Sequence, residues 1–144
     1  HLDIAKKHGA DLAICINPIV PYRNDIEKKN LPITDGKCNY IKEKGMPKVM
    51  DQVLRTMIHS RANLGIEKVV RENPGLDIII FEPSPDDITM FSHNLMSYSS
   101  RVKLAEHGFN SVREKLLFNH EFFKPIFAKH GIEVSNKLIE EEYT

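Results

Sequence analysis

The 144-residue sequence has little of what marks several classes of protein. It contains two cysteines, seven glycines and no tryptophan, and its Lys+Arg 20 balance its Asp+Glu 20. Balanced charge gives no net field that would attract nucleic acid or an anionic membrane surface. No apolar run approaches the roughly 20 residues that a membrane-spanning helix needs. We therefore expect neither a nucleic-acid partner nor a transmembrane segment.

The two cysteines, Cys15 and Cys38, do not form a metal or redox motif, because the sequence has no CxxC and no Cys/His pair with zinc spacing. Cys15 lies in an apolar run, where a thiol behaves as a small hydrophobe, and Cys38 lies in a polar segment. A disulfide between them is the less favoured interpretation, since a charge-balanced α/β chain is typical of a reducing compartment. The expected location is the cytoplasm.

Three sequence motifs of enzyme sites are also missing. The chain contains no GxSxG, no GxGxxG and no GxxxxGK[ST], so it offers no nucleophile elbow, dinucleotide turn or phosphate-binding loop. No residue is assigned as catalytic, cofactor-binding or metal-binding on this basis, and no cofactor is expected.

Two short apolar runs, residues 13–16 and 78–81, carry the main structural signal. The first is bounded by Asp11 and Pro18, the second by Asp77 and Pro83. A long helical pattern separates them, so they are predicted to be two buried parallel strands joined by a crossover. The predicted class is α/β, with the functional site at the carboxyl ends of the strands.

Four helices are predicted from apolar residues recurring every three and four positions. Residues 2–8 form the first, which ends at Gly9, and residues 121–130 form the last, which precedes a charged tail ending at Glu142. The helix over 47–73 carries one apolar stripe, made of Val49, Met50, Val53, Leu54, Met57 and Ile58. The helix over about 95–117 carries a seam expected to pack onto the sheet, made of Leu95, Tyr98, Val102, Ala105, Phe109, Val112 and Leu116.

Residues 18–45 form a long polar segment without a sustained period, punctuated by prolines. It leaves the carboxyl end of the first strand, so it is interpreted either as a flap over a site or as a surface excursion. Packing of its apolar residues onto the body is slightly favoured; they are Ile19, Val20, Tyr22, Ile26 and Leu31.

The histidines and paired acids admit both functional and structural interpretations. The seven histidines never occur as HxxxH or HExxH, so structural or capping roles are favoured, with His93 the best placed to approach a site; they are His1, His8, His59, His93, His107, His120 and His130. Asp86 and Asp87 could bind a metal, but capping a short helix is favoured. Asp35-Gly36 is interpreted first as a turn.

The order of these segments resembles a known family. The run GADLAICINPIVP is followed by a polar loop and a long helix, and then by LDIIIFEPSPDDITMF and HNLMSYSSRVKLAEHGFNSVREKL. The last of these carries an S-x-R-x-x-x-A…HG pattern, made of Ser99, Arg101, Ala105, His107 and Gly108. Over about residues 1–118, this order resembles the carboxyl-terminal portion of a bacterial patatin-like phospholipase domain.

The resemblance implies a fold and a chemistry. The family is a three-layer α/β/α sandwich that hydrolyses lipid esters with a Ser–Asp dyad, with its serine in GxSxG, its aspartate in DG[GA] and a glycine-rich oxyanion loop. Asp35-Gly36-Lys37 follows the first strand and does not occupy the family position, so it is not given the catalytic role. The dyad is therefore expected upstream of His1 in a longer parent protein, and this chain alone is expected to be inactive.

The resulting division is a patatin-like part over residues 1–118, with 18–45 as its loop or flap, and a carboxyl-terminal helix and tail over 119–144. The expected partners are the rest of the parent chain and a lipid or other ester substrate, with peripheral contact at a membrane surface. Two alternatives stay open. One is a flavodoxin-like module that binds a small molecule or nucleotide. The other is a non-catalytic interaction domain that docks a partner through the long helix of residues 47–73 and the charged tail, with Met50, Leu54 and Met57 as the positions that test it. The resemblance also implies that the apolar residues of 18–45 could contact lipid instead of packing.

Overall fold

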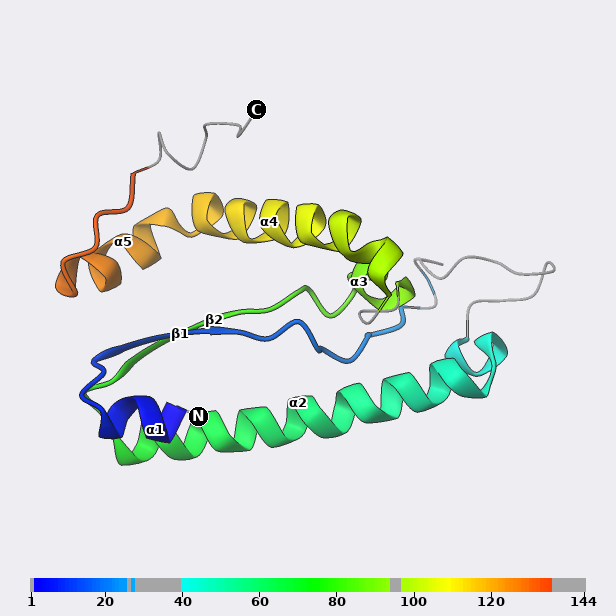
Figure 1. The fold of residues 1–144 in the computed structure, drawn as a ribbon, viewed down its shortest axis with the longest axis horizontal. Coiled ribbons are helices and arrows are strands. Elements are labelled where there is room, and N and C mark those ends of the chain that lie inside the picture. The colour runs from blue at the N-terminus through cyan, green and yellow to red at the C-terminus, as the bar shows by residue number, and fades with distance from the viewer. Residues whose placement is uncertain (1, 26, 28–39, 94–96, 136–144) are drawn as a thin grey trace.

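The computed structural model describes residues 2–25, 27, 40–93 and 97–135. Figure 1 shows the arrangement of its helices and strands. In chain order these are α1 (Leu2–Lys7), β1 (Leu12–Ile16), the 3-10 helix η1 (Ile41–Lys44), α2 (Met46–Glu72), β2 (Asp77–Phe81), α3 (Ile88–Ser92), the 3-10 helix η2 (Tyr98–Ser100), α4 (Arg101–Phe118) and α5 (His120–Lys129).

The sheet of the described residues consists of β1 and β2 in parallel, so the predicted α/β class and the parallel pairing are confirmed. The register places Leu12 opposite Asp77 and Ile16 opposite Phe81. Parallel strands need a long connection, and α2 provides it. Because both strands run in the same direction, their carboxyl ends lie at one edge of the sheet.

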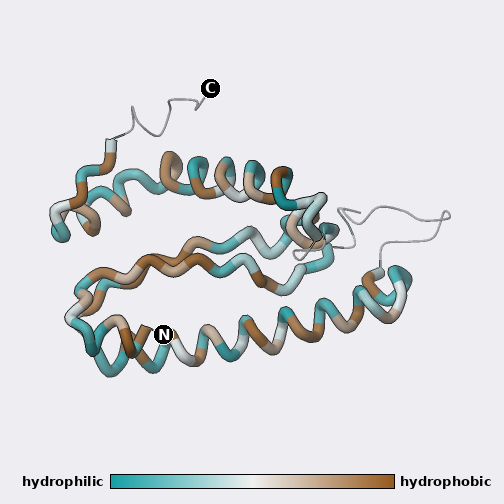
Figure 2. The backbone as a smooth tube through the Cα atoms, viewed as in Figure 1, coloured by the Kyte–Doolittle hydropathy of each residue, from teal (hydrophilic) through white to brown (hydrophobic). Residues whose placement is uncertain are grey.

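Helices lie against both faces of this sheet (Figure 1). On one face Ile79 and Phe81 of β2 pack with Phe123 and Phe127 of α5. On the other face three buried residues pack together, namely Ala13 of β1, Val69 of α2 and Leu76. The alternation follows from the two-residue period of a strand, which sends successive side chains to opposite faces. Figure 2 shows the hydrophobic residues concentrated along the two strands between the helices.

The helix ends follow from local sequence. Gly9, directly beyond α1, has a φ of 88°, a conformation that glycine adopts without the steric cost of a Cβ. Gly45 has a φ of 84° and leads into α2, whose first turn holds Pro47. Asn73 ends α2, and its side chain donates to the Val69 carbonyl at 2.9 Å. The predicted ends at Gly9 and at residue 73 are therefore confirmed.

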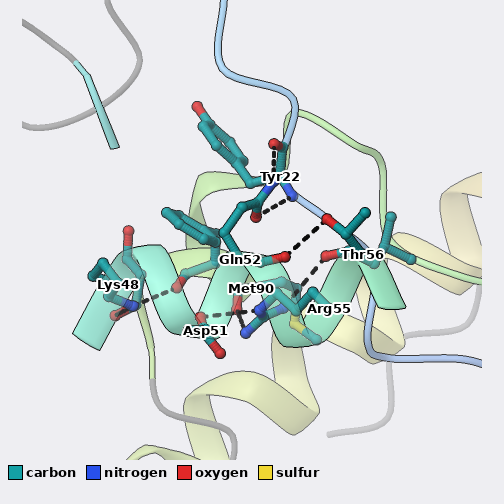
Figure 3. A network of polar contacts seen from close by, with 10 residues as sticks. Tyr22, Lys48, Asp51, Gln52, Arg55, Thr56 and Met90 are labelled. Atoms are coloured by element: carbon teal, nitrogen blue, oxygen red, sulfur yellow. Dashed lines mark hydrogen bonds and ion pairs between the residues drawn. The ribbon is translucent and has the colours of Figure 1, made fainter. Parts of the chain in front are cut away.

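The body of α2 is attached through its polar side chains (Figure 3). The Gln52 side chain accepts from the Tyr22 backbone N–H at 3.0 Å and donates to the Tyr22 carbonyl at 2.8 Å. Lys48 Nζ donates to the Phe91 carbonyl at 2.8 Å. Arg55 is 3% exposed and pairs with Asp51 at 3.0 Å. Two backbone segments distant in sequence are thus held against one polar face of α2.

The predicted apolar stripe of α2 points away from this attachment. Of its six members, Val49 is half-buried, whereas Met50, Val53, Leu54, Met57 and Ile58 are exposed. Met50 is 57% and Met57 66% exposed. The periodicity therefore identified an apolar face correctly, but that face does not contact the described body of the protein.

Two expectations of burial are wrong in part. In β1, Ile14 is 50% and Ile16 78% exposed, because α4 and α5 pack over β2 and leave the β1 side of that face uncovered. In the predicted seam, Val112 and Leu116 pack against the β2 core, but four members nearer the amino terminus are exposed. These are Tyr98, Val102, Ala105 and Phe109. Leu95 lies outside the described residues.

The first part of the 18–45 segment packs onto the body. Val20 and Tyr22 are buried, and Tyr22 stacks on Phe91 with ring centroids 4.7 Å apart. The packing interpretation is thus confirmed for these two residues. Ile26 and Leu31 lie outside the described residues, as does the interval 28–39 on which a flap would depend.

Candidate functional site

The carboxyl ends of the two strands bring two polar residues together. Asn17 directly follows β1, and its backbone N–H donates to the Phe81 carbonyl at 2.9 Å, which extends the sheet by one bond. Its side-chain amide donates to Glu82 Oε2 at 3.3 Å. Each residue is the first after its strand, so the parallel register itself sets this pair at the edge where α/β proteins place their sites.

His59 of α2 joins this pair from the neighbouring layer. Its Nδ1 lies 3.5 Å from Asn17 Nδ2 and 3.9 Å from Glu82 Oε2, and its Nε2 lies 3.1 Å from Asn63 Nδ2. The side chains of Asn17, His59 and Glu82 are part-exposed, and that of Asn63 is exposed. Polar contacts of the His59 imidazole thus join α2 to both strand ends.

A cleft of about 340 Å³ opens beside these strand ends. This volume lies within the range of small-molecule sites, which run from about 300 to 1,000 Å³. Its walls come from the strand ends, α3 and α4, and Figure 1 shows α4 lying along the sheet with α3 beside its start. The apolar lining residues are Ile16, Pro18, Phe81, Pro83, Met90, Phe109 and Val112.

One side of the cleft carries a fixed carboxylate–imidazole pair. Asp87 Oδ2 lies 2.7 Å from His107 Nε2, and Asp87 Oδ1 accepts from the Met90 backbone N–H at 3.0 Å. The Asp87 side chain is 10% exposed and the His107 side chain 34%. Asp87 therefore caps α3 and orients His107 of α4 at the same time.

Ser111 lies one turn beyond His107 on α4 and also lines the cleft. A serine nucleophile needs a base within hydrogen-bond reach. Among the hydrogen bonds of the described residues, none joins the Ser111 hydroxyl to His107. The cleft thus holds an oriented imidazole that is not hydrogen-bonded to the Ser111 hydroxyl.

The structure places the residues singled out in the sequence at separate positions. Asp87 is the N-cap of α3, which confirms the capping interpretation, and Asp86 accepts from the Ser84 hydroxyl. His93 ends α3, with Nδ1 2.9 Å from the Thr89 carbonyl. His130 ends α5 and contacts Asp77 at 2.7 Å.

Several other sequence candidates cannot be placed in this way. Asp35, Gly36 and Cys38 lie outside the described residues. Within the residues that the structure does describe, no group of three or more His, Cys, Asp or Glu side chains could hold a metal ion.

A second, larger cleft of about 830 Å³ lies on the other side of the sheet, between α1, α2 and β1. Cys15 lines it and carries a free thiol, and burial raises the pKa of that thiol. A raised pKa lowers the thiolate fraction at neutral pH, so Cys15 is not an activated nucleophile. The interpretation of Cys15 as a small hydrophobe fits this position.

Tyr22 contributes a buried polar atom outside the lining of both clefts. Its hydroxyl has no hydrogen-bond partner among the described residues. Burial raises the pKa of Tyr22, and the charges of Asp86 and Asp25 raise it further. The phenol therefore stays neutral, and its stacking on Phe91 rather than a polar contact holds it in place.

Sequence reasoning did not single out Asn17, Glu82 or Lys115. A usable signal existed for the first two, because each is the polar residue between an apolar run and a proline, at Asn17-Pro18 and Glu82-Pro83. Lys115 gave no comparable signal, since its role depends on α4 lying beside the end of β2.

In the part of the chain that is described, no helix combines the length and the apolar character needed to cross a bilayer. Comparison of the chain with family models, curated proteins and solved structures gives no match in any of the three.

Proposed function

We propose that this chain is the carboxyl-terminal part of a patatin-like lipid acyl hydrolase domain, in which it supplies the acyl-binding wall of the active site. The observation that carries the proposal is the apolar cleft of about 340 Å³ at the carboxyl ends of β1 and β2. An acyl chain needs an apolar channel, and reacting groups in α/β proteins gather at that edge of the sheet.

The uncovered apolar surfaces support the same proposal. Ile14 and Ile16 of β1 and the apolar stripe of α2 are exposed. Monomeric proteins rarely leave contiguous apolar surfaces of this kind uncovered. In a three-layer patatin-like sandwich, further strands and helices of the parent chain would cover them.

In the proposed reaction, serine attacks the ester carbonyl, aspartate accepts the serine proton, and backbone amides stabilise the oxyanion. All three groups belong to the parent chain upstream of His1. The residues described here bind and orient the acyl chain and exclude water from it. The protein works in the cytoplasm, with peripheral contact at the membrane surface that holds the lipid.

The first test is the coding sequence upstream of His1. We expect GxSxG well upstream and DG[GA] shortly before His1, and the absence of both contradicts the proposal. The 144-residue chain alone should give no turnover of a nitrophenyl ester. Turnover that disappears in Asp35→Ala would instead place the chemistry in this chain.

The second test addresses the cleft in the complete gene product. Gly108 lines the cleft, and a Cβ added there meets no atom within 4 Å, so Gly108→Leu is designed to place a side chain beside the cleft from a position with room for its Cβ. We expect kcat/KM to fall more for a long-acyl nitrophenyl ester than for the acetate ester. Gly65→Leu is the matched control, because Gly65 is also helical and open but lines the other cleft. Equal losses for both esters in Gly108→Leu contradict an acyl-binding role.

The interaction-domain alternative is favoured by one observation, the exposed stripe of α2. The flavodoxin-like alternative has less support, because β1 leads into Asn17-Pro18 rather than into a glycine turn that could hold a phosphate.

A further inference from the structure

One face of α4 presents a polar row to the cleft. His107, Ser111 and Lys115 are spaced four residues apart, and all three line it. Residues at i and i+4 lie above one another on a helix face. The opposite walls are apolar and include Phe81 and Met90. The cleft is therefore amphipathic, with the polar row of α4 along one side, and Asn17, Glu82 and Asp87 also line it.

His107 is held ready to contact a ligand. Its Nε2 is engaged by Asp87 at 2.7 Å, and Asp87 is itself fixed by the Met90 N–H. Among the described residues, Nδ1 of His107 has no hydrogen-bond partner. A protonated imidazole donates from both nitrogens, so Nδ1 can donate to a ligand in the cleft while Nε2 keeps its contact with Asp87.

Lys115 supplies a cationic donor at the end of β2. Its Nζ donates to the Glu82 backbone carbonyl at 3.1 Å, which uses one of its three N–H groups. The carboxylate of Glu82 is directed to Asn17 and His59 instead, at 3.3 Å and 3.9 Å. The two carboxylates that line the cleft, those of Glu82 and Asp87, thus already have partners of their own.

We infer that the cleft binds the free fatty acid itself, with the apolar chain against Phe81 and Met90 and the carboxylate between His107 and Lys115. The inference rests on the proposed function, because it makes the acid the product of that same site. An ionised acceptor forms hydrogen bonds about twice as strong as a neutral one. The acid therefore binds more tightly than an uncharged amphiphile of equal chain length, and it inhibits the parent enzyme as a product.

The test is calorimetric titration of the 144-residue chain with decanoate and with decanol at neutral pH, below the concentrations at which either aggregates. We expect decanoate to bind about tenfold more tightly or better, which corresponds to roughly 1.4 kcal/mol. His107→Gln and Lys115→Met should each reduce decanoate affinity towards that of decanol and leave decanol unchanged. Lys115→Arg should keep the preference, because it keeps the charge.

Lys103→Met is the matched control, because Lys103 is exposed on the same helix and does not line the cleft. Gly108→Leu should abolish binding of both ligands, and decanoate binding that survives it overturns the inference. Equal affinities for decanoate and decanol overturn it as well, but leave the apolar cleft of the proposed function intact. Binding of neither ligand contradicts both the inference and the acyl-binding role.

Discussion

The two helical layers that cover the sheet are attached in opposite ways. The α4–α5 layer is held by apolar contact, with Phe123 and Phe127 buried against Ile79 and Phe81. Most of α2 is held by hydrogen bonds and an ion pair, with Arg55 buried and the apolar stripe turned outward. Similar helical periodicity in the sequence therefore corresponds to two different kinds of attachment.

The periodic pattern of a helix identifies its apolar face, but it does not show whether that face is turned towards the core. An apolar stripe shows that a helix has an apolar face, and the helix normally turns that face inward. In α2 the backbone carbonyls of other segments accept from the polar face instead, as Tyr22 does from Gln52 and Phe91 from Lys48. A buried carbonyl needs a donor, so these contacts fix the orientation of α2 while its apolar face stays exposed.

The largest expected effect is in the apolar layer. Phe127→Ala removes a buried ring next to Phe123 and Phe81, and we expect the free energy of unfolding to fall by about 3–5 kcal/mol. Denaturant unfolding followed by circular dichroism measures it. Phe122→Ala is the control, because Phe122 is 64% exposed on the same helix. Similar losses in both variants would show that α5 does not pack as described.

The next largest effect is in the polar attachment. Arg55→Met keeps the volume of the side chain but removes its donors to Asp51 and, through longer contacts of 3.5 Å, to the Val20 and Met90 carbonyls. Leaving buried acceptors unpaired costs about 1–3 kcal/mol. Arg61→Met, on an exposed position of α2, should change stability little. An unchanged free energy of unfolding in Arg55→Met would show that the polar face of α2 does not hold the helix against the rest of the protein.

A smaller, pH-dependent effect links β2 to the end of α5. Hydrogen bonds from Lys129 and His130 lower the pKa of Asp77 below 3.8. Because the folded pKa is lowered, the stabilisation is present above the unfolded value of about 3.9 and is lost as the pH falls through the folded value.

Asp77→Asn should therefore be less stable than the parent chain at pH 6, with the difference shrinking towards pH 3. Asp11→Asn is the control, because the side chain of Asp11 is 71% exposed in its pair with Lys6. The measurement is the urea midpoint of the parent chain and of each variant at pH 6 and at pH 3. A difference that grows in acid would contradict the assigned contact.

The smallest expected effect is on the exposed stripe. Alanine at Met50, Leu54 and Met57 should leave the monomer folded, with changes within about 0.5 kcal/mol at each surface position. Sedimentation velocity of the parent chain and the triple variant then tests the interaction alternative, since association lost with folding intact marks an interface. Loss of folding would mean that the stripe is buried in solution.

Much of the fold could be predicted from local sequence. The strands followed from short apolar runs ending in proline, and the capping role of Asp87 followed from its place before Ile88. The exposed face of α2 could not be predicted, because the donors that orient it meet carbonyls far away in the sequence. The pairing of Asp87 with His107 likewise depends on α3 meeting α4, which no local pattern encodes.

The parallel pair of strands has one consequence for handling the chain by itself. Among the described residues, β1 and β2 each have one neighbour in the sheet, so each strand presents a row of backbone amides and carbonyls on its outer side. Unpaired edges of this kind template pairing between molecules. Concentrated samples should therefore aggregate by edge-to-edge strand addition, and substitution of Ile14, on β1, by lysine should slow this.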